Sequence, residues 1–587
     1  MAPLLPGDSI GLVTLNARYV HMSPAIRYLR NQSRAAGFAN TWIQEFTIQT
    51  PPWKMAQSIL ARQPKLVGFS MYIWNRQITL ALMELLKKLR PDLLLVAGGP
   101  EVSYGPPPPY VDLVLAGEGE AKWVELLGHL SAGGELPPEF IQRAGRAGSG
   151  GSPSAAIPQT GSHPTASPLP LLMPYTEEDI EGLPHRLIYV ETSRGCPFQC
   201  SFCLSALDET VVFFPEETVK THIEWLINHG ARRIKFLDRT FNARKQRALD
   251  FFRWLSGFKG VQFHFEIVGD LLDDPLAGFL DGVEPGMFQF EIGIQSADPQ
   301  TQRQVRRRQN KDRLFGVIHR LRLAGKVHLH ADLIWGLPGE DLPRLKESFR
   351  QVFDLRPHEL QLGFLKFLPG APIREDAHRY GYRFQDGPPY EFICHDRLSA
   401  AEVLELKRFE EVFDLYYNSG KFRFTLERLF ELSPPWDVFS RLGDFFLARG
   451  LFPVSHSLDH LYEYLFQAVT ISPMGEHLSR EELTDWLKLD YCYHRRVLRL
   501  PRFLQGAAPP PILQAPPPPA PPTGTVQALI PFHHELAWEG DTPRLNPAPD
   551  TRWVLFGYPP QDQGYFFKPR MAPWPPKQGG LSAHRQT

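Results

Sequence analysis

The chain is poor in cysteine, with five cysteines among 587 residues. This scarcity, together with the clustering of three of them, implies a reducing compartment. No apolar run approaches the ~20 residues that a membrane-spanning helix requires. The N-terminus also lacks the basic start and apolar core of a signal peptide. We therefore expect a cytoplasmic protein with no membrane partner.

The chain also lacks an excess of charge of either sign, because its formal net charge is −1. There is thus no global bias toward nucleic acid or an anionic membrane, and no basic, aromatic-lined surface for tRNA is evident. No Gly-x-Gly-x-x-Gly follows the first predicted strand, which argues against a nicotinamide cofactor. Hydrophobic residues make up 43% and charged residues 22%, as in an ordinary soluble protein. The length calls for several domains.

Three cysteines fall within eight residues, in Cys196-Pro-Phe-Gln-Cys200-Ser-Phe-Cys203. Three thiolates this close can converge on one inorganic centre. They are one short of a closed zinc site or a fully ligated iron–sulfur cluster. A four-iron cube held by three cysteines leaves one iron open to chelate a small molecule, which is a catalytic arrangement. The alternatives are a zinc knuckle with a distant fourth ligand and a chance clustering of the cysteines.

Hydrophobic patterning predicts an α/β protein with five regions. Residues 8–130 alternate strand-like and helical runs, which predicts a parallel, doubly wound, Rossmann-like (flavodoxin-like) sheet. Residues 131–184 are expected to be a linker, and 145–168 in particular lose all periodicity. Residues 185–385 alternate again, with strands expected at 187–190, 233–238, 261–267, 288–296, 328–335 and 359–367.

The C-terminal third has a different pattern. Residues 386–505 predict a helical domain, with helices at 398–418, 423–433, 435–449, 455–470 and 480–490. Residues 506–587 are expected to form a proline-rich tail with one possible strand at 552–558.

The cysteine spacing, with an aromatic residue before the last cysteine, resembles the radical S-adenosylmethionine (radical SAM) enzymes. That resemblance implies a partial (β/α)6 barrel of the TIM type at 185–385, a [4Fe-4S] cluster on the three cysteines and SAM on the open iron. One electron would then cleave SAM to a 5′-deoxyadenosyl radical. The residues expected to contact SAM are Phe202, Asp238, Glu266, Gln295, Ser296, Arg307 and Asp332. Arg307 is expected to pair with the SAM carboxylate.

The N-terminal region resembles the cobalamin (B12)-binding domain that precedes the barrel in one large class of these enzymes. The 416–422 stretch resembles an uncharacterised branch of that class with a C-terminal helical domain. The residues expected to contact cobalamin are Ser70, Met71, Gly98, Gly99, Pro100, Glu101, Gly117, Glu118 and Gly119. His21 is a candidate lower ligand for cobalt, although its motif lacks the aspartate and glycine of Asp-x-His-x-x-Gly. Another side chain, or none, is the alternative we favour.

These resemblances imply a cobalamin-dependent radical SAM methyltransferase acting on an unactivated carbon. A non-methylating radical rearrangement or cyclisation on the same architecture is one alternative. A non-enzymatic sensor of cobalamin or of the cluster is another. An electron donor such as flavodoxin or ferredoxin is the expected partner, and the substrate is not readable from the sequence.

Overall fold

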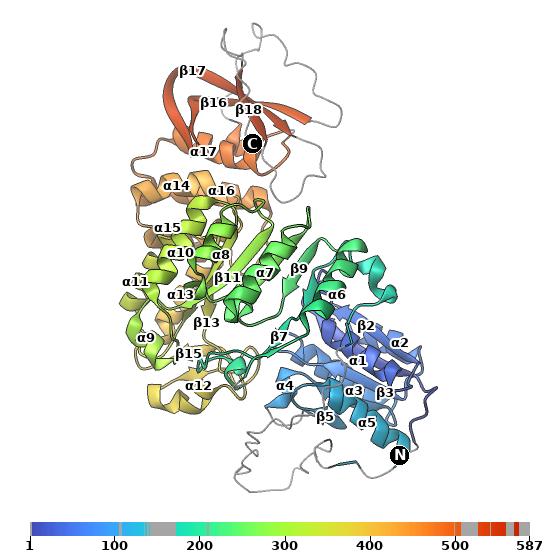
Figure 1. Ribbon diagram of the computed structural model, residues 1–587. Coiled ribbons are helices and arrows are strands. Elements are labelled where there is room, and N and C mark those ends of the chain that lie inside the picture. The colour runs from blue at the N-terminus through green and yellow to red at the C-terminus, as the bar shows by residue number, and fades with distance from the viewer. Residues whose placement is uncertain are drawn as a thin grey trace. The chain divides into compact units, whose positions relative to one another are not determined.

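The computed structural model describes residues 3–104, 108–133, 136–137, 140, 172–207, 210–497, 499–505, 526–540, 542–558 and 569–574. The expected linker core at 145–168 lies outside them. The chain divides into two compact units, Met1–Asp341 with Gly363–Arg397, and Leu342–Leu362 with Leu398–Thr587 (Figure 1). Within the described part of the chain, no helix is long and apolar enough to cross a bilayer.

The N-terminal sheet is parallel, with strand order β2-β1-β3-β4-β5. This is the flavodoxin-like order, and it confirms the predicted doubly wound fold. The strands are β1 (Ile10–Asn16), β2 (Thr41–Thr47), β3 (Leu66–Ser70), β4 (Leu94–Gly98) and β5 (Leu113–Leu115). The helices are α1 (Pro24–Ala35), α2 (Pro52–Leu60), α3 (Arg76–Leu89), α4 (Pro100–Ser103) and α5 (Glu120–Ala132). Apolar residues of α2 and α3 pack in one core cluster, and those of α1 and α5 in another.

The second sheet has six strands in the order β13-β12-β11-β10-β9-β6, which confirms the predicted partial barrel (Figure 1). They are β6 (Ile188–Val190), β9 (Arg233–Phe236), β10 (Gln262–Ile267), β11 (Phe288–Gln295), β12 (His328–Trp335) and β13 (Glu359–Phe364). Its helices include α6 (Glu216–Asn228), α7 (Lys245–Leu255), α8 (Asp274–Leu280), α9 (Pro299–Gln304) and α10 (Lys311–Ala324). Along each strand, fully buried residues alternate with partly exposed ones. Buried phenylalanines such as Phe252, Phe265 and Phe290 pack ring against ring between α7 and the strands.

Buried ion pairs join the N-terminal sheet to the barrel. Arg27 on α1 donates to Asp179, which lies in the turn before the barrel, at 2.8 Å. Its other nitrogens reach Glu45 at 3.1 Å and the Ser23 carbonyl at 2.7 Å. Arg186, just before β6, also donates a hydrogen bond to the Glu45 carboxylate, at 2.8 Å. Every member of this set is paired, so none of these buried charges is left uncompensated.

The second unit is mainly helical. It contains α11 (Leu342–Phe353), α13 (Ala400–Phe413), α14 (Arg423–Leu432), α15 (Pro435–Ala448), α16 (Leu458–Ile471) and α17 (Arg480–Tyr493). A π-helical turn, Asp414–Asn418, prolongs α13, and Asn418 exchanges two hydrogen bonds with the backbone of Leu360. Aromatic rings of α11, α13 and α15 pack edge to face, for example Phe349 on Phe409. Helix α11 therefore belongs with the bundle although it follows a barrel strand in the chain.

The tail prediction was wrong in one respect. We expected one strand at 552–558, and the structure has an antiparallel sheet of β16 (Val526–Glu539), β17 (Thr542–Tyr558) and β18 (Arg570–Trp574). Prolines inside β16 and β17 conceal these strands, because proline removes a ladder hydrogen bond and normally marks a non-strand. Buried Asp485 of α17 anchors β16 by accepting hydrogen bonds from the backbone N–H groups of His533 and His534, at 2.6 and 2.8 Å.

Candidate active site

The three cysteines lie on one loop at the carboxyl end of β6, between the short strands β7 (Ser193–Arg194) and β8 (Val212–Phe213). Cys200 is buried, and Cys196 and Cys203 are partly exposed. The Cys203 N–H donates to the Cys200 carbonyl at 3.0 Å, which makes a tight turn between them. Phe202 is half-buried inside that turn. The loop thus places all three thiols at the mouth of the barrel, where catalytic groups of such sheets gather.

The donor set, three cysteine thiols on one loop, fits a multi-iron cluster. Among the described residues, no three His, Cys, Asp or Glu side chains stand close enough to ligate a single ion. In a four-iron cube each thiolate binds a different iron, so the sulfurs need not converge on one point.

Arg307 lies beside the cysteines. Its Nη1 is 3.5 Å from Cys200 Sγ, and its Nη2 donates to the Gly293 carbonyl on β11. Burial raises the pKa of the Cys200 thiol, and Arg307 works against that rise. The structure therefore brings Arg307 to the expected site. There it contacts a cysteine thiol and a backbone carbonyl.

Asp238 is bonded to the residues that follow β6. Its carboxylate accepts hydrogen bonds from Thr192 N–H, Thr192 Oγ1 and Ser193 Oγ, at 2.9, 2.6 and 2.6 Å. Burial raises its pKa, and these bonds oppose the rise. With both oxygens engaged, Asp238 holds the backbone that leads into the cysteine loop. Its assignment to SAM stays a prediction.

Gln295 carries the clearest sign of a ligand. It ends β11 at a register shift and has a positive φ of 72°, which is uncommon for a residue other than glycine. Its side-chain Oε1 is buried and finds no hydrogen-bond partner among the described residues. Such an atom needs a partner that the protein itself does not supply. A SAM hydroxyl or amine would fit it.

Ser296 makes hydrogen bonds within the protein. Its Oγ donates to Glu340 Oε1 at 2.8 Å and accepts from the Asp298 N–H at 3.2 Å. Glu340 ends the Gly336-Leu-Pro-Gly-Glu turn after β12. Ser296 therefore joins the ends of two barrel strands.

The interior face of the barrel carries pairs of ionisable groups. Glu291 accepts from Lys235 and His264, both at 2.9 Å, and these partners hold its pKa well below its usual value against the effect of burial. Asp332 lies 3.1 Å from His330, and burial raises its pKa. The contact is an ion pair only if His330 is protonated, and the assignment of Asp332 to SAM stays a prediction.

Glu266 remains available to a ligand at the end of β10. Burial raises its pKa, and its nearest cation, Arg239, is 3.8 Å away, beyond a hydrogen bond. The assignment of Glu266 to SAM therefore stays a prediction that its position allows.

The residues expected to contact cobalamin lie at the carboxyl edge of the N-terminal sheet. Gly99 has a φ of 103°, and a Cβ there would meet the Met71 carbonyl oxygen at 2.6 Å. Only glycine permits this close approach of two loops. Ser70 Oγ donates to Thr14 Oγ1 at 2.6 Å, and Met71 is fully buried in the core. Both side chains therefore contact other residues of the N-terminal domain at this edge of the sheet.

The remaining members differ in what they contact. Gly98 ends β4, Pro100 begins α4, and Gly117 and Gly119 lie in the β5–α5 loop, where Gly117 has a φ of 79°. Glu118 is exposed and stands 3.7 Å from Arg194. Glu101 is buried, and its Oε2 accepts a hydrogen bond from Tyr390 at 2.8 Å. The glycines keep the edge open to a bulky ligand, whereas the two acids are engaged with the barrel side.

His21 is engaged elsewhere. Its Nδ1 is 2.6 Å from the Tyr189 hydroxyl on β6, and its backbone bridges to Leu187. The imidazole therefore joins the sheet to the barrel, which favours the reading that cobalt takes its lower ligand from another side chain or from none.

Sequence reasoning missed two groups near the site. Tyr72 and Trp74 stack at 4.5 Å between ring centroids with an angle of 4°, and Trp74 is half-exposed. They present a flat aromatic surface in the β3–α3 loop. Arg194 bonds Glu120 at 2.6 Å and Glu191 at 2.8 Å, which ties the start of the cysteine loop to α5. Both aromatic residues are plain in the sequence, but their stacking is not.

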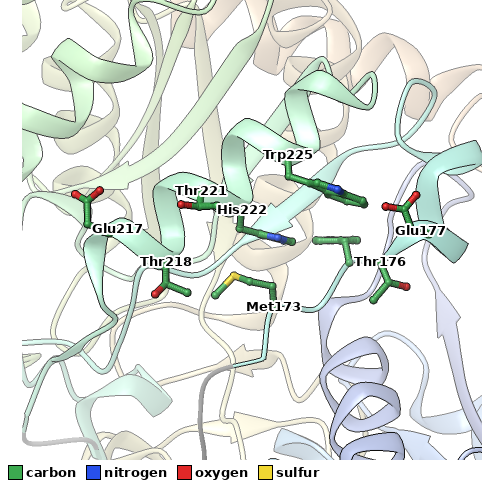
Figure 2. Close-up of a pocket in the computed structure, with 9 residues that line it drawn as sticks. Met173, Thr176, Glu177, Glu217, Thr218, Thr221, His222 and Trp225 are labelled. Atoms are coloured by element: carbon green, nitrogen blue, oxygen red, sulfur yellow. The ribbon is translucent and has the colours of Figure 1, made fainter.

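A separate hollow of about 690 Å³ lies between α6 and the segment at 173–177 (Figure 2). Tyr175, His222 and Trp225 line it with nearly parallel rings. None of the residues expected at the site lines it. The Nε2 of His222, which has no partner among the described residues, is buried rather than exposed to the hollow.

Comparisons with known proteins agree with this domain organisation. Three family models match: "B12 binding domain" at residues 10–127, "Radical SAM superfamily" at 190–352, and "Protein of unknown function (DUF4080)" at 378–511. The chain is 26% identical over 383 residues to the cobalamin-dependent radical SAM methyltransferase TokK of Streptomyces tokunonensis, covering 61% of this chain and 55% of that protein. It is 24% identical over 355 residues to 2-(S-pantetheinyl)-carbapenam-3-carboxylate methyltransferase of Streptantibioticus cattleyicolor, covering 55% and 50%. The chain spans about half the length of these curated relatives.

Solved structures show the same fold at low identity. TsrM from Kitasatospora setae, a radical SAM methyltransferase with cobalamin and a [4Fe-4S] cluster bound, superposes with a TM-score of 0.53 at 17% identity, covering 65% of this chain and 78% of that one. The cobalamin-dependent enzyme OxsB, with aqua-cobalamin and SAM bound, gives 0.54 at 15%, covering 82% and 79%.

Proposed function

Because this chain belongs to the radical SAM enzymes that carry a B12-binding domain, we propose that it methylates an unactivated carbon of its substrate. Its domains imply a [4Fe-4S] cluster, SAM and cobalamin as cofactors. When bound, these groups supply a 5′-deoxyadenosyl radical and a methyl group. The protein's part is to hold the cluster, to orient SAM and substrate, and to exclude water.

The cysteine loop carries this proposal. Cys196, Cys200 and Cys203 would hold the cluster, with Arg307 stabilising the Cys200 thiolate. Gln295 and Glu266 would orient SAM, since Gln295 offers a buried unpaired oxygen and Glu266 a loosely paired carboxylate. Gly98, Gly99 and Gly117, with the Tyr72–Trp74 surface, would receive the corrin. Arg194 joins the two halves of this site.

The reaction requires an electron, so we propose a small acidic redox protein such as flavodoxin or ferredoxin as partner. A cytoplasmic setting suits it, since the thiols must stay reduced. The two relatives named as methyltransferases support methyl transfer over rearrangement.

The test is reconstitution without oxygen, using iron, sulfide and hydroxocobalamin, followed by an assay for 5′-deoxyadenosine. Replacing Cys200 by Ala should reduce the product to background, because an iron loses its ligand. Replacing the lone buried Cys492 by Ala is the matched control and should leave 5′-deoxyadenosine formation intact. Product formation by the Cys200 variant would refute the cluster assignment. Labelled methyl from SAM in a substrate separates methylation from rearrangement.

A further inference from the structure

A segment after the barrel contacts both halves of the active site. We name residues 365–397 the strap; it includes α12 (Pro372–Glu375), β14 (Arg383–Phe384) and β15 (Phe392–Cys394). The Ile373 N–H donates to the carbonyl of Ser201, between Cys200 and Cys203, at 2.9 Å. The Tyr390 hydroxyl donates to Glu101 Oε2 at 2.8 Å, directly after Gly98-Gly99-Pro100. One short segment thus bonds the cysteine loop and the cobalamin edge.

Tyr390 is held firmly in the strap. It is buried, and its carbonyl accepts from Phe367 N–H at 2.7 Å while its own N–H donates to the Gly387 carbonyl at 2.8 Å. The guanidinium of Arg374 lies 5.4 Å from its ring centroid. Its φ is 56°, a left-handed conformation that costs energy for a bulky residue. Such strain persists only where surrounding contacts enforce it.

The Glu101 end is equally well defined. Arg76 Nη1 donates to the Glu101 carbonyl at 2.8 Å and stands 3.5 Å from its Oε2. A second contact lies beside it, since a Cβ on Gly370 would come within 2.5 Å of the Tyr104 ring. The strap therefore contacts α4 and the residue after it at two places, through Tyr390 on Glu101 and through Gly370 beside Tyr104.

We propose that Tyr390 is a positioning residue that sets the spacing between the cobalamin edge and the cysteine loop. If the strap only had to pack against the cobalamin edge, apolar contacts would suffice. A hydrogen bond to a buried carboxylate is directional and strong, so it selects one separation. This inference rests on the proposed function, because the spacing matters only if cobalamin and the cluster act on the same SAM and substrate.

The first measurement needs no cofactor. Hydrogen–deuterium exchange of the full chain before reconstitution should show faster exchange in residues 98–104 for Tyr390→Phe than for the wild type. Tyr416→Phe is the matched control, because it deletes a buried tyrosine hydroxyl bonded to the Leu461 carbonyl in the other unit. Unchanged exchange at 98–104 in the Tyr390 variant would overturn the proposal whatever the enzyme does.

The second measurement separates positioning from folding. In the reconstituted protein with SAM and a chemical reductant, 5′-deoxyadenosine reports the cluster, and S-adenosylhomocysteine reports methyl transfer from SAM to cobalt. Tyr390→Phe should keep 5′-deoxyadenosine within about twofold of the wild type and lower S-adenosylhomocysteine roughly tenfold. Pulsed electron paramagnetic resonance should show a broader distance distribution between the reduced cluster and Co(II). Equal loss of both products, or an unchanged distribution, would overturn the proposal.

A second variant guards against misfolding. Glu101→Gln keeps an oxygen that accepts from Tyr390, so its product ratio should lie nearer the wild type than that of Tyr390→Phe. The reverse order would contradict the proposal. If the wild type makes neither nucleoside, the proposed function fails, and the exchange measurement still decides whether Tyr390 orders the edge.

Discussion

Arg307 stands between two possible roles, and one substitution separates them. Family resemblance assigns it to the SAM carboxylate, whereas its Nη1 lies 3.5 Å from Cys200 Sγ. A guanidinium at that distance stabilises a thiolate that burial disfavours. We therefore predict that Arg307→Met lowers iron per protein and cluster absorbance severalfold. The exposed Arg308→Met should retain both. Full iron content with weakened SAM binding would instead assign Arg307 to the carboxylate.

Single residues were predictable to the extent that their chemistry is local. The cysteines stand out because their spacing alone defines a ligand set. Asp238 follows β9 and Glu101 lies in α4, just after β4, but their partners, Thr192 and Tyr390, come from distant parts of the chain. A sequence shows that a carboxylate ends a strand and does not show which donor reaches it first. Arg194 was missed because nothing near it in the sequence marks a three-acid neighbourhood.

Among the structural elements, the turn entering the cysteine loop is the most constrained. Gly195 has a φ of 90°, and a Cβ there would meet the Thr210 carbonyl oxygen at 2.1 Å. Gly195→Ala should therefore separate β7 from β8 and prevent cluster assembly. Gly260 also has a positive φ, of 72°, but nothing lies within 4 Å of its Cβ position. Gly260→Ala should cost only about 1 kcal/mol and keep the cluster.

The measurement is iron content with thermal unfolding for both glycine variants. If they behaved alike, backbone conformation alone would explain Gly195 and the close contact with Thr210 would be irrelevant.

Strands with a regular alternation of buried and polar residues could be predicted from the sequence, whereas strands interrupted by proline could not. Strand β10 alternates buried Phe263 and Phe265 with polar His264 and Glu266, so its period of two is plain. The C-terminal sheet was missed because Pro531, Pro543 and Pro547 interrupt β16 and β17. Its anchor, Asp485, lies in α17, and a buried acid in a helix has no periodic signal. Tertiary contacts therefore stabilise these strands, although the local sequence does not favour them.

At the scale of the whole molecule, buried histidines should make stability depend on pH. Burial lowers the pKa of His222, His328 and His494 to about 4, from 6.5 in the unfolded chain. The folded state therefore favours neutral imidazoles. As pH falls below about 6.5, the unfolded chain binds protons that the folded chain refuses, so stability drops until about pH 4. Each histidine contributes at most about 3 kcal/mol to this loss.

His222 offers the cleanest test, since its ring packs between Tyr175 and Trp225 and its Nε2 bonds nothing among the described residues. Phenylalanine keeps the packing and cannot take up a proton. Between pH 7.5 and 5, His222→Phe should lose less stability than the wild type, by about 2 kcal/mol at most. Denaturant unfolding of the cofactor-free chain at both pH values measures this, with exposed His460→Gln as control. Equal losses in all three proteins would mean that His222 binds protons alike in the folded and unfolded chain, so that burial does not lower its pKa.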